Sequence, residues 1–318
     1  MNTEKKILFG IDDSEFALQA VTAVGGMLKN SRDHKVTLFF GAPDPNLPFL
    51  SKALGLSAEA IEEFEKVCTL EEQKVLDRCK EALTNSGFNS DRVEMICEAK
   101  CSDPAYHLLQ LATEQGFETL ALGLRGSARA ERKLMGSVAY KLAHTAKDQA
   151  LWIIDPRISS RDVLVALVGA PIGIRVVEHV VTYFSHLKDS RFTFFHVTPP
   201  LPPQYWDDAR ILDTKEGQER EEQISQWMKG YTDRVKAIAV EGREKLIKAG
   251  VPEKNVSFKI QPREGGIARD ILEELENNDY GILVIGRKGS KEIDQFGLGS
   301  KAHKLLHNAH ALAICVVN

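Results

Sequence analysis

The stretch KILFGI at residues 6–11 recurs as DVLVAL at residues 162–167, an offset of 156. The same offset relates VTLFF at 36–40 to FTFFH at 192–196. Further along the chain the offset becomes 163, which relates LALG at 120–123 to LVIG at 283–286. The difference of seven residues falls inside each half, where helices and loops tolerate insertions. The chain is therefore predicted to be an internal duplication.

Each half alternates short apolar runs with longer helical patterns, as is typical of βαβ units and a parallel sheet. Strands are expected near 6–11, 35–41, 92–97, 119–123 and 150–154, and again near 162–168, 191–197, 255–260, 281–286 and 312–317. Five strands with crossover helices predict an α/β, doubly wound sheet, in which ligands bind at the carboxyl ends of the strands. We expect one domain over residues 1–155 and a second over 161–318, joined by a short turn-forming linker.

The composition limits the classes of protein and partner. Hydrophobic residues make up 43% of the 318 residues and charged residues 27%, as in globular proteins with real cores. The formal charge of -4 gives no basic field to attract nucleic acid, so a bound anion needs a local site. No apolar run is long enough to span a membrane, and no signal peptide is evident. The five cysteines, odd in number and irregularly spaced, argue against a secreted disulfide framework, so the cytoplasm is expected.

A glycine pattern follows the fourth expected strand of each half. The first copy is Gly123-x2-Gly126-x9-Gly136-Ser137, and the second is Gly286-x2-Gly289-x9-Gly299-Ser300. Glycines allow the backbone to approach a phosphate, and the helix that follows presents free N–H groups and its positive dipole end. Arg125, Arg129, Lys288 and Lys291 add positive charge to these loops. Two interpretations stay open: a phosphate site, or glycines that shape turns and serines that cap helices.

These residues resemble the universal stress protein family, whose nucleotide-binding members share this glycine pattern. The first apolar run, followed by Asp12-Asp13-Ser14, and the apolar stretch 309–317 at the end agree with the family's first and last strands. The resemblance covers nearly the whole chain twice and implies a tandem universal stress protein. It implies the sheet order 3-2-1-4-5 and a pseudo-twofold relation in which the fifth strands pair as an intramolecular pseudo-dimer. A further homodimer is left open.

The resemblance also implies that ATP, with or without Mg²⁺, lies across the carboxyl edge of the sheet. Residue by residue it points to Asp12, Gly41, Gly123, Gly126, Gly136, Ser137 and Val138, and in the second half to Val197, Gly286, Gly289, Gly299 and Ser300. The loop cations Arg125 and Lys288 complete the set of candidates. In the second half Val168 stands where the first has Asp12, and a valine cannot accept a hydrogen bond. We therefore expect the first half to bind ATP more tightly.

The leading hypothesis is an ATP-binding stress-response or signalling module with at most very slow hydrolysis. The chain has no Gly-x4-Gly-Lys-Ser/Thr loop, and so lacks the lysine and hydroxyl that hold Mg-ATP in efficient ATPases. The alternative is an interaction protein of the same fold without a nucleotide. An adenylating enzyme would need Ser-Gly-Gly after the first strand, where residues 11–14 read Ile-Asp-Asp-Ser. No catalytic residue is assigned; Cys97 is expected in the core and Cys101 as a free thiol in a loop.

Overall fold

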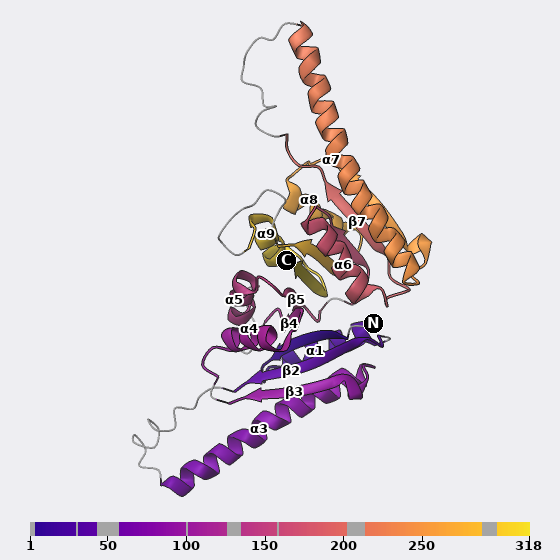
Figure 1. Ribbon diagram of the computed structural model, residues 1–318. Coiled ribbons are helices and arrows are strands. Elements are labelled where there is room, and N and C mark those ends of the chain that lie inside the picture. Colours follow the sequence, from indigo (N-terminus) through magenta and orange to yellow (C-terminus); the bar gives the residue numbers. More distant parts are fainter. Residues whose placement is uncertain are drawn as a thin grey trace. The chain divides into compact units, whose positions relative to one another are not determined.

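The computed structural model describes residues 4–29, 31–42, 57–99, 101–125, 135–157, 159–201, 214–287 and 298–318. These residues divide into two compact units. Those up to Arg161, together with Leu298 and His310–Val316, form the first unit. Those from Asp162 to Arg287, together with Gly299–Ala309 and Val317–Asn318, form the second (Figure 1). Among the described residues, no helix combines the length and apolar character needed to cross a membrane.

The first unit is built on a parallel sheet. Its strands are β1 (Lys5–Ile11), β2 (His34–Gly41), β3 (Val93–Glu98), β4 (Thr119–Gly123) and β5 (Ala150–Ile154). Their order is β3-β2-β1-β4-β5, so the expected order 3-2-1-4-5 is confirmed. The chain's last strand, β10 (Ala313–Val317), pairs antiparallel with β5, with Cys315 opposite Trp152. Strands with both faces covered read as continuous apolar runs, and Ile7, Leu8 and Phe9 are each 0% exposed.

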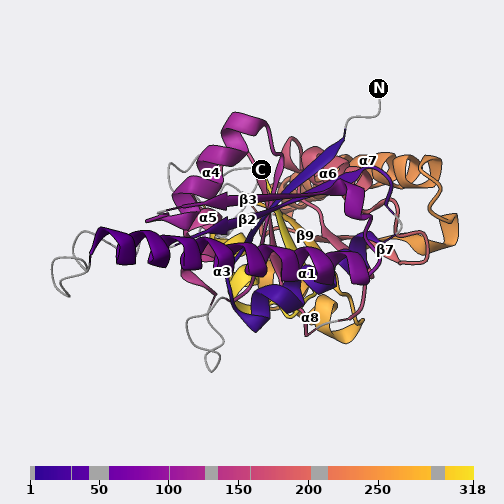
Figure 2. The same ribbon diagram turned by 90° about the horizontal axis from the view of Figure 1, so that it is seen from below.

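The helices of the first unit cover both faces of this sheet. They are α1 (Glu15–Leu28), α3 (Ala58–Asn85), α4 (Pro104–Gln115) and α5 (Ser137–Thr145). α1 packs on α3 and α4 packs on α5, and Figure 2 shows α1 and α3 on one side of β2 and β3 with α4 on the other. α1 and α3 approach closely at Gly25, where an added Cβ would lie 2.6 Å from the carbonyl oxygen of Leu83. The arrangement is a doubly wound α/β fold.

The second unit repeats this architecture. Its parallel strands β6 (Val163–Ala166), β7 (Phe192–Val197), β8 (Val256–Gln261) and β9 (Ile282–Gly286) run in the order β8-β7-β6-β9. Its helices are α6 (Ile172–Phe184), α7 (Thr214–Lys248), α8 (Ile267–Asn277) and α9 (Ser300–Asn308). α6 packs on α7 and α8 on α9, as α1 packs on α3 and α4 on α5. The duplication in the sequence is therefore a duplication of topology.

Cys97 lies in an environment opposite to the one expected, whereas Cys101 is a free thiol in a loop, as expected. Cys97 is exposed on β3, where its Sγ donates to Oε2 of Glu72 at 3.3 Å. Cys101 is buried, because its N–H donates to the carbonyl of Ala42 at 2.7 Å and the segment after β3 folds over the end of β2. β3 is the outer strand of the unit's strand order and pairs on its inner side with β2, so several of its side chains remain exposed. The expectation for Cys97 was wrong because an outer strand leaves some of its side chains exposed.

The close approach of α6 to the segment that follows β6 gives a prediction about stability. A Cβ at Gly173 would lie 2.1 Å from the carbonyl oxygen of Val168, a backbone atom that cannot move aside alone. Gly173→Ala should lower the free energy of unfolding by about 1–3 kcal/mol, the usual cost of overpacking. The control is Gly230→Ala on α7, where the nearest atom lies 3.7 Å away. That variant should gain about 0.5–1 kcal/mol from helix propensity. Urea unfolding measures both, and a neutral Gly173→Ala would show that α6 can shift freely.

Candidate functional site

Three candidate residues of the first unit meet at the carboxyl edge of its sheet. Asp12 directly follows β1, while Gly41 ends β2 and Gly123 ends β4. The register pairs Ile11 with Phe40 and Gly10 with Leu122, which places the ends of the three neighbouring strands at one level. Ligands of doubly wound sheets bind at this edge.

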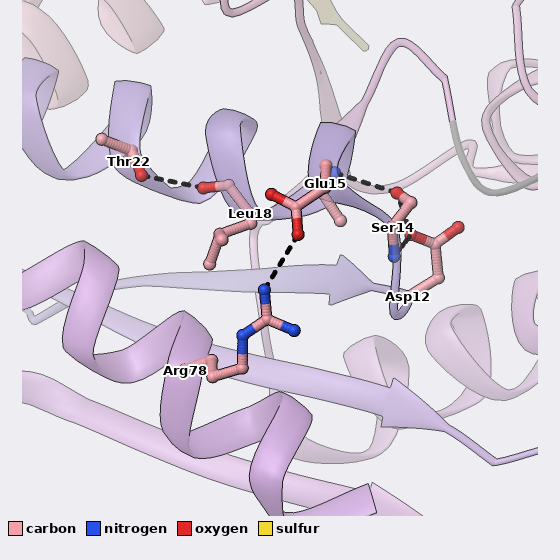
Figure 3. A network of polar contacts seen from close by, with 7 residues as sticks. Asp12, Ser14, Glu15, Leu18, Thr22 and Arg78 are labelled. Atoms are coloured by element: carbon pink, nitrogen blue, oxygen red, sulfur yellow. Dashed lines mark hydrogen bonds and ion pairs between the residues drawn. The ribbon is translucent and has the colours of Figure 1, made fainter. Parts of the chain in front are cut away.

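The Asp12 side chain is oriented by the start of α1 (Figure 3). Its Oδ1 accepts hydrogen bonds from the N–H of Ser14 at 3.1 Å and from the Ser14 hydroxyl at 2.5 Å. The same hydroxyl oxygen accepts from the N–H of Ala17 at 3.1 Å and caps α1. Glu15, the next residue, instead pairs with Arg78 of α3 at 2.9 Å. A carboxylate has about four lone-pair positions, so the half-buried Asp12 retains acceptor capacity at the edge.

Among the described residues, no side chain caps the N-terminus of α5, unlike the other helices of this unit. Ser14, Ser57 and Asp103 each accept a hydrogen bond from the first turn of α1, α3 and α4. Gly136 is the N-cap of α5, with φ -61° and ψ 152°, and no described side chain caps this helix. Ser137 is its first helical residue, so the proposed capping role of this serine is not realised. The first-turn N–H groups of α5 thus keep the anion-binding capacity of an open helix end.

Packing also explains two of the candidate residues. A Cβ at Gly41 would lie 2.8 Å from Sγ of Cys101, so a glycine is needed there whatever binds at the edge. The Arg125 guanidinium lies 5.3 Å from the ring centre of Phe16. Burial alone would raise the pKa of Asp155, but hydrogen bonds from Arg157 and the charges of Arg157 and Arg125 hold it below its usual value. Arg125 thus shares its charge with a carboxylate of its own unit.

The remaining candidates of the first unit divide between described and undescribed parts of the chain. Val138 is the second residue of α5 and is half-buried, so its backbone N–H belongs to the open first turn. Gly126 and Arg129 lie outside the described residues, as do Lys288, Gly289 and Lys291 of the second half. The described residues resume at Met135, just before α5, and the N–H of Gly136 donates to the carbonyl of Leu124 at 2.9 Å.

The second unit reproduces the helix end almost unchanged. Gly299 is the N-cap of α9, with φ -63° and ψ 149°, and no described side chain caps the helix. Its N–H donates to the carbonyl of Arg287 at 3.0 Å, the counterpart of the bond from Gly136 to Leu124. Gly286 ends β9, Val197 ends β7 and Ser300 begins α9. The sequence repeat therefore corresponds to a repeated backbone geometry at both glycine loops.

A cavity of about 950 Å³ occupies the carboxyl edge of the second unit. It is lined by the ends of β6, β7 and β9, by residues 168–170 between β6 and α6, by the starts of α8 and α9, and by residues of α7. Four sequence candidates line it, namely Val197, Gly286, Gly299 and Ser300. Six of the described lining residues are Arg or Lys and none is Asp or Glu: Arg234, Arg263, Arg269, Arg287, Lys301 and Lys304. The sequence analysis did not identify most of this basic lining, because its members come from separate segments.

His196 is a further lining residue that the sequence analysis did not single out. It is 2% exposed, and its Nδ1 lies 2.8 Å from the carbonyl oxygen of Leu167. Burial lowers the pKa of this imidazole. The sequence could have indicated it only as a polar residue at the position that corresponds, at the offset of 156, to Phe40 of the first half. Trp227 and Tyr231 of α7 also line the cavity. They lie between the segments that the two repeat offsets relate, so the repeat gave no signal for them.

Comparisons with known proteins agree on one family. A model of the universal stress protein family matches residues 4–150 and again residues 160–316. No curated protein matches the chain. A solved universal stress protein from Archaeoglobus fulgidus is 16% identical with a TM-score of 0.62, over 99% of this chain and 98% of that one. A functionally unknown protein from Pseudomonas aeruginosa is 11% identical with a TM-score of 0.57, over 99% and 93% of the two chains.

A shorter solved relative is described as a universal stress protein in complex with cAMP. It is 19% identical, covers 48% of this chain and 98% of its own, and has a TM-score of 0.33. The two family matches fall one in each half and together take in most of the chain. The chain therefore belongs to the universal stress protein family, as a tandem of two family domains.

Proposed function

We propose that the first unit binds ATP at the carboxyl edge of its sheet, and that the protein is a nucleotide-dependent stress-response or signalling module. The observation that carries this proposal is the open N-terminus of α5, with a glycine at the N-cap, at the same sheet edge as the oriented carboxylate of Asp12. An open helix end favours phosphate, and a carboxylate accepts from hydroxyl groups or holds a cation.

The roles follow from these two groups. The backbone N–H groups of Ser137 and Val138 donate to phosphate oxygens, helped by the positive end of the α5 dipole. Asp12 accepts a hydrogen bond from the nucleoside or contributes to a Mg²⁺ site. Mg²⁺ usually takes one or two carboxylates together with substrate phosphates, so a single Asp12 fits that ion. The metal would neutralise phosphate charge; hydrolysis stays very slow because the chain lacks the lysine and hydroxyl of a P-loop.

Asp12→Asn tests the proposed contact between the carboxylate that follows β1 and the bound nucleotide or Mg²⁺. The substitution removes a charge without changing the side chain's size, and a hydrogen bond to a charged group contributes about 1.5–3 kcal/mol. The affinity for Mg-ATP should fall about ten- to a hundredfold, measured by calorimetry. The matched control is Asp13→Asn, the exposed neighbour, which should bind within about twofold of the wild type. Equal binding by wild type and Asp12→Asn would remove Asp12 from the site.

The second candidate function, an interaction protein without nucleotide, shares the same fold. Direct identification separates the two candidates. The purified protein is heat-denatured, and any released nucleotide is identified by mass spectrometry. ATP in the released fraction, together with saturable ATP binding by the emptied protein, supports the proposal. No released nucleotide and no saturable binding by calorimetry would favour the interaction protein.

A further inference from the structure

Two histidines of α9 lie next to each other on one face of the helix. His303 and His307 are one turn apart, and their ring centroids are 4.4 Å apart with an interplanar angle of 45°. Side chains at this separation in sequence are neighbours on a helix surface. Both residues are half-buried, so each ring keeps part of its surface accessible. Neither belongs to the described lining of the cavity of the second unit, so the pair is separate from that cavity.

The spacing of the two rings suits a chelated metal ion. Imidazole is a favoured ligand of Cu²⁺, Ni²⁺ and Zn²⁺, and histidines at positions i and i+4 of one helix form the chelating pair of the His-Glu-x-x-His zinc motif. Zinc–nitrogen bonds are about 2.0–2.1 Å long, which places the centroids of two imidazoles bound to one ion about 4.5–5 Å apart. The 4.4 Å in α9 is close to this separation. A small rotation of both side chains therefore brings one nitrogen of each ring to a common ion.

The position of the pair within α9 also favours a bound cation. His307 lies in the last turn of the helix, where the negative end of the helix dipole stabilises positive charge. The two lysines of this helix, Lys301 and Lys304, line the cavity instead. Because both imidazoles are fixed on one rigid helix, the second metal–nitrogen bond forms within the molecule and costs less entropy than the first.

The first unit repeats this ring arrangement with one ligand exchanged. Tyr140 and His144 of α5 correspond to His303 and His307 at the offset of 163. Their ring centroids are 4.5 Å apart with an interplanar angle of 40°. The Nδ1 of His144 lies 2.9 Å from the carbonyl oxygen of Tyr140, the kind of contact that orients a metal-binding imidazole and leaves Nε2 to coordinate. Tyr140 offers a phenol in place of an imidazole, so the chelating pair belongs to the second unit.

We infer that His303 and His307 bind a divalent transition-metal ion of the class that prefers imidazole, namely Cu²⁺, Ni²⁺ or Zn²⁺. No group of three or more histidine, cysteine, aspartate or glutamate side chains in the described part of the chain is placed to hold a metal ion. The site therefore has two protein ligands among the described residues, and water completes the coordination. Structural zinc sites have four protein ligands and catalytic sites three, so binding here is weaker and readily reversible. The inference does not depend on nucleotide binding by either unit.

The test titrates the untagged full chain with Zn²⁺ by calorimetry at pH 7.5, where an ordinary imidazole is neutral and can coordinate. The wild type should bind one Zn²⁺ saturably, and Zn²⁺ should shift the imidazole NMR signals of two of the nine histidines. His303→Tyr gives α9 the residue of the first unit and should weaken binding at least about tenfold. The matched control is His186→Gln, a histidine just after α6, which should bind within about twofold of the wild type.

A gain-of-function variant keeps the test independent of any loss of folding. Tyr140→His places an imidazole beside His144, whose ring already has the required spacing, and should add a second equivalent of bound Zn²⁺. Zn²⁺ should also raise the melting temperature of the wild type more than that of His303→Tyr, because a ligand that binds the folded state stabilises it. Circular dichroism confirms that each variant is folded.

Three results would overturn the inference. The first is the absence of saturable Zn²⁺ binding by the wild type. The second is equal affinity in the wild type and His303→Tyr, which would mean that the ion binds adventitiously to other side chains. The third is a folded Tyr140→His protein that binds no additional ion, because the ring spacing would then not create a site.

Discussion

Gly136→Asp is expected to abolish ATP binding by the first unit while leaving the unligated protein as stable as the wild type. Gly136 is the N-cap of α5 with a negative φ of -61°, which any residue can adopt. Aspartate is a favourable N-cap residue and replaces glycine with a gain of a few tenths of a kcal/mol. Its carboxylate, however, takes the first-turn N–H groups and repels phosphate. A charge pair at about 4 Å near a surface is worth up to about 4 kcal/mol, so affinity should fall at least a hundredfold.

The matched control is Gly299→Asp, at a position whose φ and ψ differ from those of Gly136 by only a few degrees. Calorimetry in excess Mg²⁺ compares both variants with the wild type, and thermal unfolding reports their stability. The tight Mg-ATP site should survive Gly299→Asp and disappear in Gly136→Asp. The reverse pattern would place the tight site in the second unit. Unchanged affinity in both variants would mean that the glycines only shape the turns.

Acid should destabilise the second unit through His179. This residue of α6 stacks on Tyr183, with ring centroids 4.5 Å apart, and burial lowers its pKa from 6.5 to about 3. Between these two values the unfolded chain binds a proton that the folded chain does not, so stability falls as pH falls from about 6.5 to 3. Each unit of pKa shift corresponds to 1.36 kcal/mol, which gives a total loss on the order of 5 kcal/mol. None of this stability is lost above about pH 6.5, where His179 is neutral in both the folded and the unfolded chain.

His179→Phe keeps a ring between the same neighbours and removes the titration. Urea unfolding at pH 7.5 and pH 4.5, followed by tryptophan fluorescence, measures the change for each protein. The wild type should lose about 2–3 kcal/mol more than His179→Phe over this interval. Comparing the losses, rather than the absolute stabilities, cancels any change in packing and the acid effects common to both proteins. Equal losses would show that His179 takes up its proton in the folded state.

The sequence by itself determined the duplication and the α/β class, and its resemblance to the family implied the strand order within the sheet. The duplication and the class follow from local patterns: buried parallel strands need continuous apolar runs such as residues 6–11, and crossover helices need longer periodic segments. It also located the glycine loops, because glycines at fixed spacing before a helix serve a backbone requirement. The extents of the two domains, 1–155 and 161–318, and the roles of the candidate residues in ligand binding stay predictions.

The tertiary structure decided which groups surround each candidate site. His196 became a candidate only when its burial and its contact with Leu167 were known, and Trp227 only when α7 was placed beside the ends of β6 and β7. The open ends of α5 and α9 likewise depend on Gly136 and Gly299, rather than the serines, being the N-cap residues. Burial, tautomer and charge environment arise from contacts between segments far apart in the chain. Local sequence patterns carry no record of those contacts, and so the chemistry of the cavity emerged only from the fold.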